Sequence, residues 1–406
     1  MGRRERVVDV LVVGAGPAGL SAAARLAAAG AVRVEVLERE PVAGGVPVHC
    51  DHPGFGLRAR GLRPVTGPEY ARRLAGAAVR AGASLRTGVT ATGWAGPRVL
   101  DTTGPGGLER ITARAVVLAT GARDRPRAAR LVPGTRPAGV LTAGELQRAV
   151  YGYGRQVGRR AVVAGGGPVA AHAVAALRRA GAVVAALATG EPGPGPRTAG
   201  AGAPVLAGAV VTELLGRGRL SGVRLRHPDG RETLVRCDTV VFTGDWIPDH
   251  ELARTAGAAL DPATRGPAVD GSFRTSLPGV FAAGNALRGI ERAAVAAAEG
   301  RAVAGAVLAR LAGAAPPWPA GGTPPVRVAA PFRWVVPNRL GGTPGRFLLR
   351  PDRPLTDPVV VARQDGRTLA RWSPRGTFGP HRSLALPGGW ADAADPAGGP
   401  VLLAAD

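Results

Sequence analysis

A glycine-rich turn between an apolar run and an alanine-rich run constrains this chain more than any other feature. Residues 7–13 (VVDVLVV) are rich in β-branched side chains and predict a strand covered on both faces. The turn GAGPAG follows at 14–19, and the run LSAAARLAAAG that ends at Gly30 favours a helix. Residues 33–37 (RVEVL) predict a second strand, closed by Glu38. Together these residues predict a complete βαβ unit.

The turn has the GxGxxG spacing of dinucleotide-binding folds. In that spacing Gly14 makes the tight turn, Gly16 lets the backbone approach a pyrophosphate, and Gly19 lets helix and strand pack closely. The helix that follows presents free N–H groups and a positive dipole end to phosphates. A carboxylate at the end of the second strand can accept hydrogen bonds from the adenosine ribose. We therefore expect a bound dinucleotide rather than a Rossmann fold that has lost its ligand, with contacts from Gly14, Gly16, Pro17, Ala18, Gly19, Glu38 and Arg39.

A second βαβ pattern begins near Arg160, with the turn GGGPVA at 165–170 between a strand and a helix. Short strand-like runs after residue 326 predict a small β domain. The predicted fold class is α/β, with two Rossmann-like dinucleotide-binding domains and a small C-terminal β domain. We expect these boundaries: 1–120 and 240–315 for a discontinuous first domain, 121–239 for the inserted second domain, 316–325 for a linker and 326–406 for the β domain.

Four stretches of the chain resemble the FAD-dependent pyridine nucleotide–disulfide oxidoreductase superfamily. They are the two glycine turns, VVLATGAR at 116–123 and TSLPGVFAAGN at 275–285. The resemblance implies FAD as the cofactor and places Asn285 where the family has an acid. An asparagine can still hydrogen-bond a ribityl hydroxyl or a phosphate, but it brings no charge. The further FAD-site residues implied are Gly45, Val46, Ala119, Thr120, Gly121 and Gly284.

A narrower resemblance lies at 44–70 and is supported by residues 122–147. These runs are similar to a branch that contains the flavin subunits of bacterial amine, opine and hydrogen-cyanide-forming dehydrogenases. They are most similar to oxidoreductases encoded beside glycerol-3-phosphate dehydrogenases. Members of this branch do not share one substrate, so the resemblance does not identify the substrate of this chain.

The second glycine turn has the spacing GxGxxA. In relatives this fold binds NAD(P)H, which would contact Gly165, Gly167 and Ala170 here. The following strand ends in Ala-Thr-Gly at 188–190, without an acid for a ribose hydroxyl, and the nearest arginine is Arg197. NAD(P)H binding therefore stays open against a domain kept only for packing. If a nicotinamide binds, no strong preference for NADH over NADPH is expected.

Catalytic residues are not identified, and Cys50 and His52 are weak candidates. The HCxH run at 49–52 offers soft metal ligands, but a fourth ligand is missing, so no metal is predicted. A redox or base role beside the flavin competes with a purely structural loop. The other cysteine, Cys237, is distant in sequence, so no dithiol–disulfide reductase activity is expected.

The amino-acid composition limits which kinds of binding partner and which compartment are expected. A net charge of +23 would suit a protein that binds nucleic acid or a membrane surface. All 52 basic residues are arginines, however, and they are scattered without interleaved aromatic residues, so no nucleic-acid partner is expected. No apolar run is long enough for a membrane span. The two cysteines and an N-terminus unlike a signal peptide predict a cytoplasmic protein.

The resemblance implies an FAD-dependent oxidoreductase that transfers hydride, through flavin, between NAD(P)H and a small-molecule or protein acceptor. One alternative is the flavin subunit of an amine- or alcohol-type dehydrogenase that passes electrons to a partner protein. The other alternative is a non-catalytic scaffold that retains FAD. The sequence does not choose the substrate or the acceptor.

Overall fold

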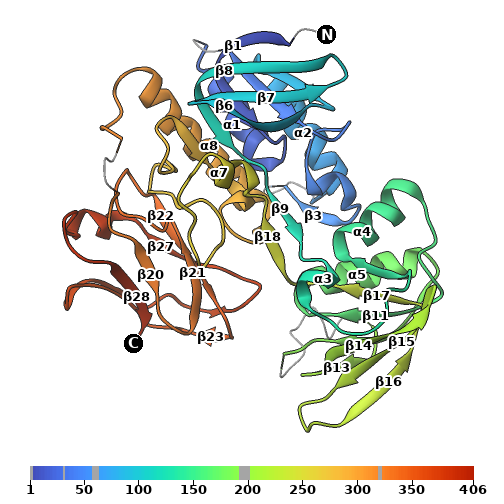
Figure 1. Ribbon diagram of the computed structural model, residues 1–406. Helices are drawn as coiled ribbons and strands as arrows, with labels where there is room; N and C mark the ends of the chain where they lie inside the picture. The colour runs from blue at the N-terminus through green and yellow to red at the C-terminus, as the bar shows by residue number, and fades with distance from the viewer. Residues whose placement is uncertain (1–2, 31–32, 57–63, 192–201, 319–321) are drawn as a thin grey trace. The chain divides into compact units, whose positions relative to one another are not determined.

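The computed structural model describes residues 3–30, 33–56, 64–191, 202–318 and 322–406, so part of the predicted linker lies outside the described residues. The chain divides into two compact units (Figure 1). The first unit comprises residues 1–48, 55–122 and 248–406, and the second comprises 49–54 and 123–247. No helix among the described residues is both long and apolar enough to cross a membrane.

The first unit is built on a sheet with the strand order β5-β2-β1-β8-β7-β6, in which β19 also pairs with β8. Strands β1, β2, β5, β8 and β19 run parallel, whereas the β6–β7 hairpin adds antiparallel strands. The bounds are β1 Arg4–Val13, β2 Val34–Glu38, β5 Ser84–Thr87, β6 Thr90–Gly96, β7 Val99–Gly104, β8 Gly107–Leu118 and β19 Val280–Ala282.

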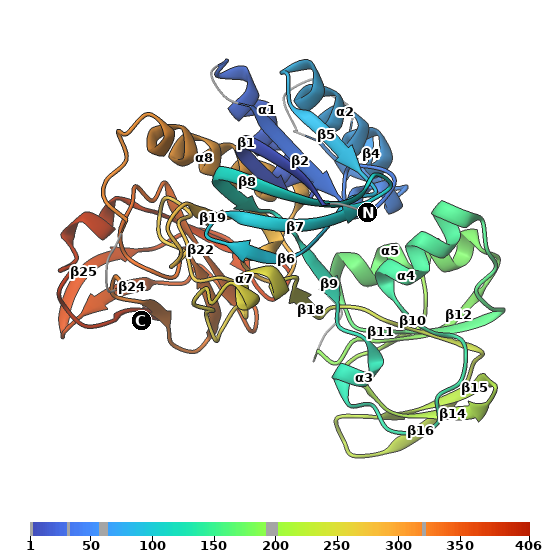
Figure 2. The same cartoon turned by 45° about the horizontal axis from the view of Figure 1, so that its top comes forward.

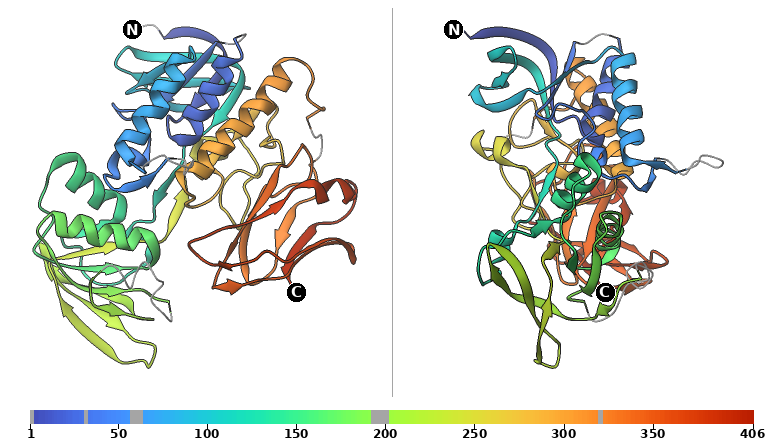
Figure 3. Two further views of the ribbon diagram at one scale, coloured as in Figure 1. Left: turned by 180° about the vertical axis from the view of Figure 1, so that it is seen from behind. Right: turned by 90° about the vertical axis from the view of Figure 1, so that its right-hand side faces the viewer.

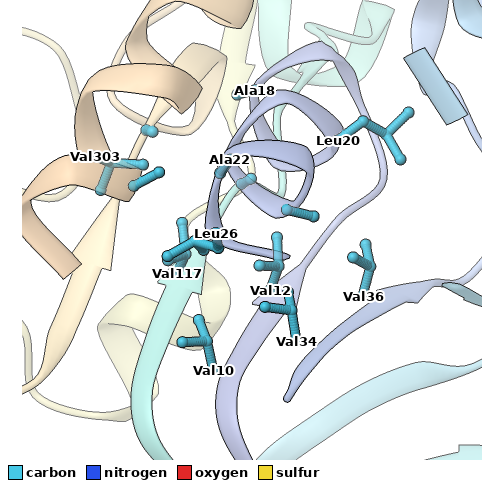
Figure 4. Packing of buried hydrophobic residues seen from close by; sticks show 14 of the residues in the cluster. Val10, Val12, Ala18, Leu20, Ala22, Leu26, Val34, Val36, Val117 and Val303 are labelled. Carbon is cyan, nitrogen blue, oxygen red and sulfur yellow. The ribbon is translucent and has the colours of Figure 1, made fainter. Parts of the chain in front are cut away.

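Three helices of this unit are α1 (Pro17–Ala28), α2 (Gly67–Arg80) and α8 (Ala293–Leu311). Figure 2 shows α1 and α2 on one face of the sheet. Because strand side chains alternate between faces, Val10 and Val12 pack under α1, and their neighbours Leu11 and Val13 belong to the opposite core. Figure 4 shows Leu26 of α1 and Val303 of α8 in the first of these cores.

The second unit has a parallel sheet with the order β10-β17-β11-β12-β13. Figure 3 shows α4 and α5 on one face of this sheet and the β14-β15-β16 meander on the other. Separate apolar cores fill the two faces. The bounds are β10 Val140–Thr142, α4 Ala143–Gln147 with a π-helical continuation Arg148–Gly152, β11 Arg160–Ala164, α5 Gly167–Arg179, β12 Val183–Ala188, β13 Val205–Leu206, β14 Val210–Arg217, β15 Arg219–Arg226, β16 Glu232–Arg236 and β17 Thr239–Phe242.

The C-terminal β domain belongs to the first unit. Its larger sheet has the order β20-β28-β24-β25 and its smaller sheet the order β21-β22-β27. Trp334, Val336 and Leu348 join the same core as β8, so the domain packs on the first Rossmann-like domain. The bounds are β20 Val326–Val328, β21 Phe332–Val336, β22 Arg346–Pro351, β24 Val360–Gln364, β25 Arg367–Trp372, β27 Leu384–Pro387 and β28 Val401–Ala405.

The remaining short elements lie within or between these parts. They are the 3-10 helices Val46–His49, Gly284–Ala286 and Gly389–Ala393, the helices α3 Arg127–Arg130 and α7 Glu251–Thr255, and the strands β3 Pro53–Phe55, β4 Val65–Thr66, β9 Ala122–Asp124, β18 Trp246–Pro248, β23 Leu355–Thr356 and β26 Thr377–Phe378.

Candidate functional site

The first glycine turn needs glycine at two of its positions. Gly14 has a left-handed φ of +103°, and a Cβ on it would lie 2.4 Å from the carbonyl oxygen of Ala119. A Cβ on Gly19 would lie 1.9 Å from the carbonyl oxygen of Gly14. Both contacts are with backbone, which cannot move aside cheaply. The turn is therefore as tight as the GxGxxG spacing requires.

The N-terminus of α1 is open toward an anion. Its N-cap is Gly16, whose backbone is extended, and neither a side-chain cap nor an acidic residue lies in the first turn. Pro17 begins the helix, where a missing N–H costs nothing. A Cβ on Gly16 would meet no atom within 4 Å, so the space beside this helix end is free. The N–H groups of the first turn, including that of Ala18, are thus available to a pyrophosphate.

Glu38 ends β2 beside the same turn and is buried. One carboxylate oxygen accepts the N–H of Ala15 at 3.0 Å, and the other accepts the N–H of Glu40 at 3.0 Å. Each oxygen keeps a further lone pair that can accept a ribose hydroxyl. Its neighbour Arg39 is exposed and forms an ion pair with Asp249 at 3.4 Å.

Three further segments meet at this turn. Gly45 has a φ of +64°, and a Cβ on it would lie 3.0 Å from the Cα of Gly16, while Val46 beside it is exposed. The Thr120 hydroxyl donates to the carbonyl of Asp249 at 2.6 Å, which fixes the segment of Ala119, Thr120 and Gly121 at the end of β8. A Cβ on Gly284 would lie 2.7 Å from the Cβ of Ala18. Four of the predicted FAD-site segments therefore surround one helix end.

The segment after β19 is held by residues that the sequence did not single out. The N–H of Gly284 donates to a carboxylate oxygen of Glu299 on α8 at 3.1 Å. Burial raises the pKa of Glu299, against the opposing charge of Arg288. The fully buried guanidinium of Arg288 lies 2.6 Å from that carboxylate. Asn285 accepts the N–H of Glu291 through its side-chain oxygen at 3.0 Å.

These residues fit FAD. The uncapped α1 N-terminus suits a pyrophosphate, the free space over Gly16 admits it, and Glu38 suits a ribose. At most of the glycines around this helix end, an added Cβ would collide with neighbouring atoms. Gly16 and Gly121 are the exceptions, because nothing lies within 4 Å of a Cβ at either position. Gly16 and Gly121 therefore border free space that a ligand can occupy.

The second glycine turn repeats this architecture in the second unit. Gly165 has a φ of +124°, and a Cβ on it would lie 2.3 Å from the hydroxyl of Thr243. Helix α5 starts at Gly167, its N-cap is Gly166, and no side-chain cap or acid lies in its first turn. Ala170 is fully buried, so a methyl group fits where the first turn has its third glycine. This helix end can also receive a pyrophosphate.

An acid stands beside the second turn, although residues 188–190 at the end of the strand carry none. A Cβ on Gly166 would lie 3.6 Å from a carboxylate oxygen of Glu191. The backbone carbonyl of Glu191 accepts the Thr189 hydroxyl at 3.0 Å and the N–H of Gly208 at 2.7 Å. These bonds turn the chain back after β12 ends at Ala188. The signal in the sequence is the first carboxylate after the strand, three residues beyond its end.

Cys50 belongs to the second unit, where its thiol lies 3.1 Å from the side-chain oxygen of Gln147. Burial, reinforced by the charge of Asp124, raises the pKa of Cys50 to about 12. Burial also raises the pKa of Cys237 to about 11. Both cysteines are buried and neither is in a disulfide. Neither thiol has the low pKa of a reactive cysteine.

His52 lies in the same segment and stacks on His172 of α5, with ring centroids 3.5 Å apart. Burial lowers the pKa of His52. Within the described ranges no group of three or more His, Cys, Asp and Glu side chains could hold a metal ion. Cys50 and His52 remain predictions as catalytic residues.

Comparison with known proteins identifies relatives. The family model described as Pyridine nucleotide-disulphide oxidoreductase matches residues 8–300. An opine oxidase subunit of Rhizobium meliloti is 30% identical over 331 residues, covering 72% of this chain and 61% of the relative. Ferredoxin–NADP reductase of Ignicoccus hospitalis is 29% identical over 308 residues, covering 72% and 94%. The chain spans less than two thirds of the length of the opine oxidase subunits it matches.

Among solved structures, thioredoxin reductase of T. acidophilum has a TM-score of 0.63 and 26% identity. The match covers 76% of this chain and 99% of that one. This likeness confirms the predicted α/β fold with two Rossmann-like domains.

Proposed function

This chain belongs to the pyridine nucleotide-disulphide oxidoreductase family. We propose that NADH reduces the FAD of this oxidoreductase. The match to residues 8–300 includes both glycine turns. The predictions of the family, of FAD and of an oxidoreductase are confirmed at this level. The choice of NADH, the acceptor and the roles of individual residues are our proposals.

In the first unit, the chain's own groups bind and orient the cofactor. The N–H groups at the start of α1 bind the pyrophosphate, and Gly16 leaves room for it. Glu38 accepts hydrogen bonds from the adenosine ribose, while the N–H of Ala15 keeps its carboxylate in place. When bound, FAD supplies the redox chemistry by taking up hydride and passing electrons on.

Glu191 is the observation that carries the choice of NADH. Its carboxylate stands beside Gly166, the position that corresponds to Ala15, which Glu38 contacts in the first turn. A carboxylate there accepts hydrogen bonds from the 2′ and 3′ hydroxyls of the NADH ribose. The same negative charge repels the 2′-phosphate of NADPH. The helix α5 N-terminus binds the pyrophosphate.

We infer that electrons do not pass through a cysteine pair. A dithiol relay needs thiolates, and the raised pKa values of Cys50 and Cys237 keep both thiols protonated near neutral pH. The two cysteines also differ in surroundings, because Cys237 belongs to an apolar core and Cys50 is bound to an amide side chain. The acceptor is therefore a small molecule or a partner protein that takes electrons from flavin directly.

A second candidate is the flavin subunit of an amine-oxidising complex. It is favoured by the similarity to the opine oxidase subunit of Rhizobium meliloti over 331 residues. In that case an amine reduces the flavin, and the electrons leave to another protein of the complex. We infer a cytoplasmic location for either function, because buried thiols persist without a disulfide in a reducing compartment.

Anaerobic titration of the flavin-loaded protein tests both candidates. We expect NADH to bleach the visible flavin absorbance at concentrations about tenfold lower than NADPH requires. Bleaching by an opine, with none by NADH, would replace our proposal by the amine-oxidising function. Protein that takes up no FAD would contradict the family-based assignment itself.

A further inference from the structure

We propose that Arg350 of the C-terminal β domain is a positioning residue for the flavin site, acting through Glu291 on Asn285. The inference rests on the proposed binding of FAD at the N-terminus of α1. It gives the C-terminal domain a task in cofactor binding, although that domain lies outside the residues matched to the family.

Asn285 is oriented by a backbone hydrogen bond. Its side-chain oxygen accepts the N–H of Glu291 at 3.0 Å, so the amide must turn its NH₂ group the other way. Among the described residues that NH₂ group has no hydrogen-bond partner. The preceding residue, Gly284, packs against Ala18 in the first turn of α1. Asn285 thus offers a neutral donor beside the helix end that receives the pyrophosphate, where a carboxylate would offer a negative acceptor.

Glu291 is held from the C-terminal domain. Arg350 and Ser383 both donate to one oxygen of its carboxylate, and both side chains of the ion pair are at most 7% exposed. Arg350 also donates to the carbonyls of Ile290 at 2.9 Å and Pro380 at 2.7 Å. Burial raises the pKa of Glu291, but the charges of Arg350 and Arg288 outweigh it and hold the pKa below its usual value. Glu291 is therefore an anion that depends on Arg350.

The other end of the segment is tied to the same network. The ring of Trp334 has Arg288 at 5.7 Å on its face and Arg350 at 5.2 Å, measured from the guanidinium carbon to the ring centroid. Arg288 in turn pairs with Glu299, which accepts the N–H of Gly284. One buried network therefore fixes residues 284–291 at both ends.

Removing Arg350 would leave the Glu291 charge buried without its main partner, which proteins avoid by moving the group or protonating it. Either response displaces the N–H that orients Asn285. We expect the dissociation constant of FAD to rise about ten- to a hundredfold, the usual effect of losing a hydrogen bond to a charged group.

The test measures FAD binding by quenching of flavin fluorescence, using full-length protein stripped of flavin. Arg350→Met should raise the dissociation constant at least about tenfold. Arg350→Lys, which keeps a charge near Glu291, should stay within about threefold of wild type. The double variant Arg350→Met with Glu291→Gln removes both charges and should recover most of the affinity. Arg371→Met is the matched control, because Arg371 pairs with Asp406 on the exposed surface of the same domain.

Wild-type affinity in folded Arg350→Met would overturn the inference and leave the proposed function standing. Absence of FAD binding in the wild type would overturn both. If Arg350→Met does not fold, Ser383→Ala carries the test, since it removes one donor from Glu291 and keeps the ion pair. A rise of about threefold or more in the dissociation constant supports the inference, and an unchanged value overturns it.

Discussion

The two glycine turns share the same backbone conformation at their first glycine, but their acidic residues lie in different surroundings. In both turns the first glycine has a left-handed φ and presses against the end of a neighbouring strand, at Ala119 for Gly14 and at Thr243 for Gly165. In the first turn the acid is Glu38, buried at the end of its strand and bonded to the turn. In the second turn the acid stands in a loop after the strand.

This difference suits two kinds of ligand. The Glu38 carboxylate is buried at the end of a strand, so it needs little rearrangement when the ligand arrives, which favours tight binding. Glu191 is only half-buried and depends on a loop held by Thr189 and Gly208. We infer that the first turn is built for a cofactor that stays and the second for a donor that exchanges. The following variants test that distinction.

The largest effect is expected from Gly16→Leu. The backbone of Gly16 tolerates a side chain and a Cβ meets nothing within 4 Å, so the protein should fold. The new side chain would fill the space beside the open α1 N-terminus and lower FAD affinity by at least about a thousandfold. Purified protein should be colourless, with a normal far-UV circular dichroism spectrum.

Two further glycine variants serve as controls for Gly16→Leu, one in the same turn and one in the second turn. Gly19→Leu should fail to fold, because its Cβ would lie 1.9 Å from a backbone oxygen. Gly166→Leu in the second turn should keep FAD and lose bleaching by NADH. If Gly16→Leu retained stoichiometric flavin, the pyrophosphate would not lie at this helix end.

The next effect concerns the thiols, both of which lie in the second unit. With pKa values of about 12 for Cys50 and about 11 for Cys237, folded protein at about pH 8 has very little thiolate. Alkylation by iodoacetamide should therefore be roughly a thousandfold slower for Cys50 than in unfolded protein, as followed by mass spectrometry. Cys50→Ser and Cys237→Ser should each retain NADH-dependent electron transfer. Rapid labelling of either cysteine would reopen the dithiol relay.

The sequence predicted what depends on local spacing. Residues 14–19 and 165–170 fix their turns through glycine geometry, and the flanking runs form the expected strands and helices. The β6–β7 hairpin was not predicted, because residues 90–104 carry little of the apolar alternation that marks a strand. The Arg350–Glu291 pair joins residues 59 positions apart, so only the folded packing of the β domain brings it together.

A moderate effect is expected from Glu191→Gln. The amide keeps the shape of the side chain and loses the charge that repels a 2′-phosphate. The preference for NADH over NADPH should fall about tenfold, measured as the ratio of the two dissociation constants in anaerobic titrations. Glu38→Gln should instead weaken FAD binding and leave the nicotinamide preference unchanged. Glu213→Gln, in a surface pair with Arg224 of the same unit, is the control and should change neither. An unchanged preference in Glu191→Gln would mean that Glu191 does not reach the ribose.

The smallest expected effect is a difference between the two units in how their stability depends on pH. Burial lowers the pKa of His52 below its usual value of about 6.5, so the folded second unit favours the neutral imidazole. The stability that this provides is complete above about pH 6.5 and is lost as the pH falls through the lowered pKa. In the first unit, the lowered pKa of Glu291 delays the corresponding loss until the pH falls below about 4.3.

Calorimetry between about pH 7 and pH 5 should therefore show a melting temperature that falls by about 1–2 °C more in the wild type than in His52→Gln. The comparison of the two proteins isolates His52, because Asp124 titrates in both. Burial raises the pKa of Asp124, so its protonation favours the folded state as the pH falls and opposes the effect of His52. His381→Gln in the C-terminal domain should follow the wild type. Identical pH dependence in the wild type and His52→Gln would mean that the stack on His172 holds equally well with a charged ring, and that acid does not distinguish the two units through this residue.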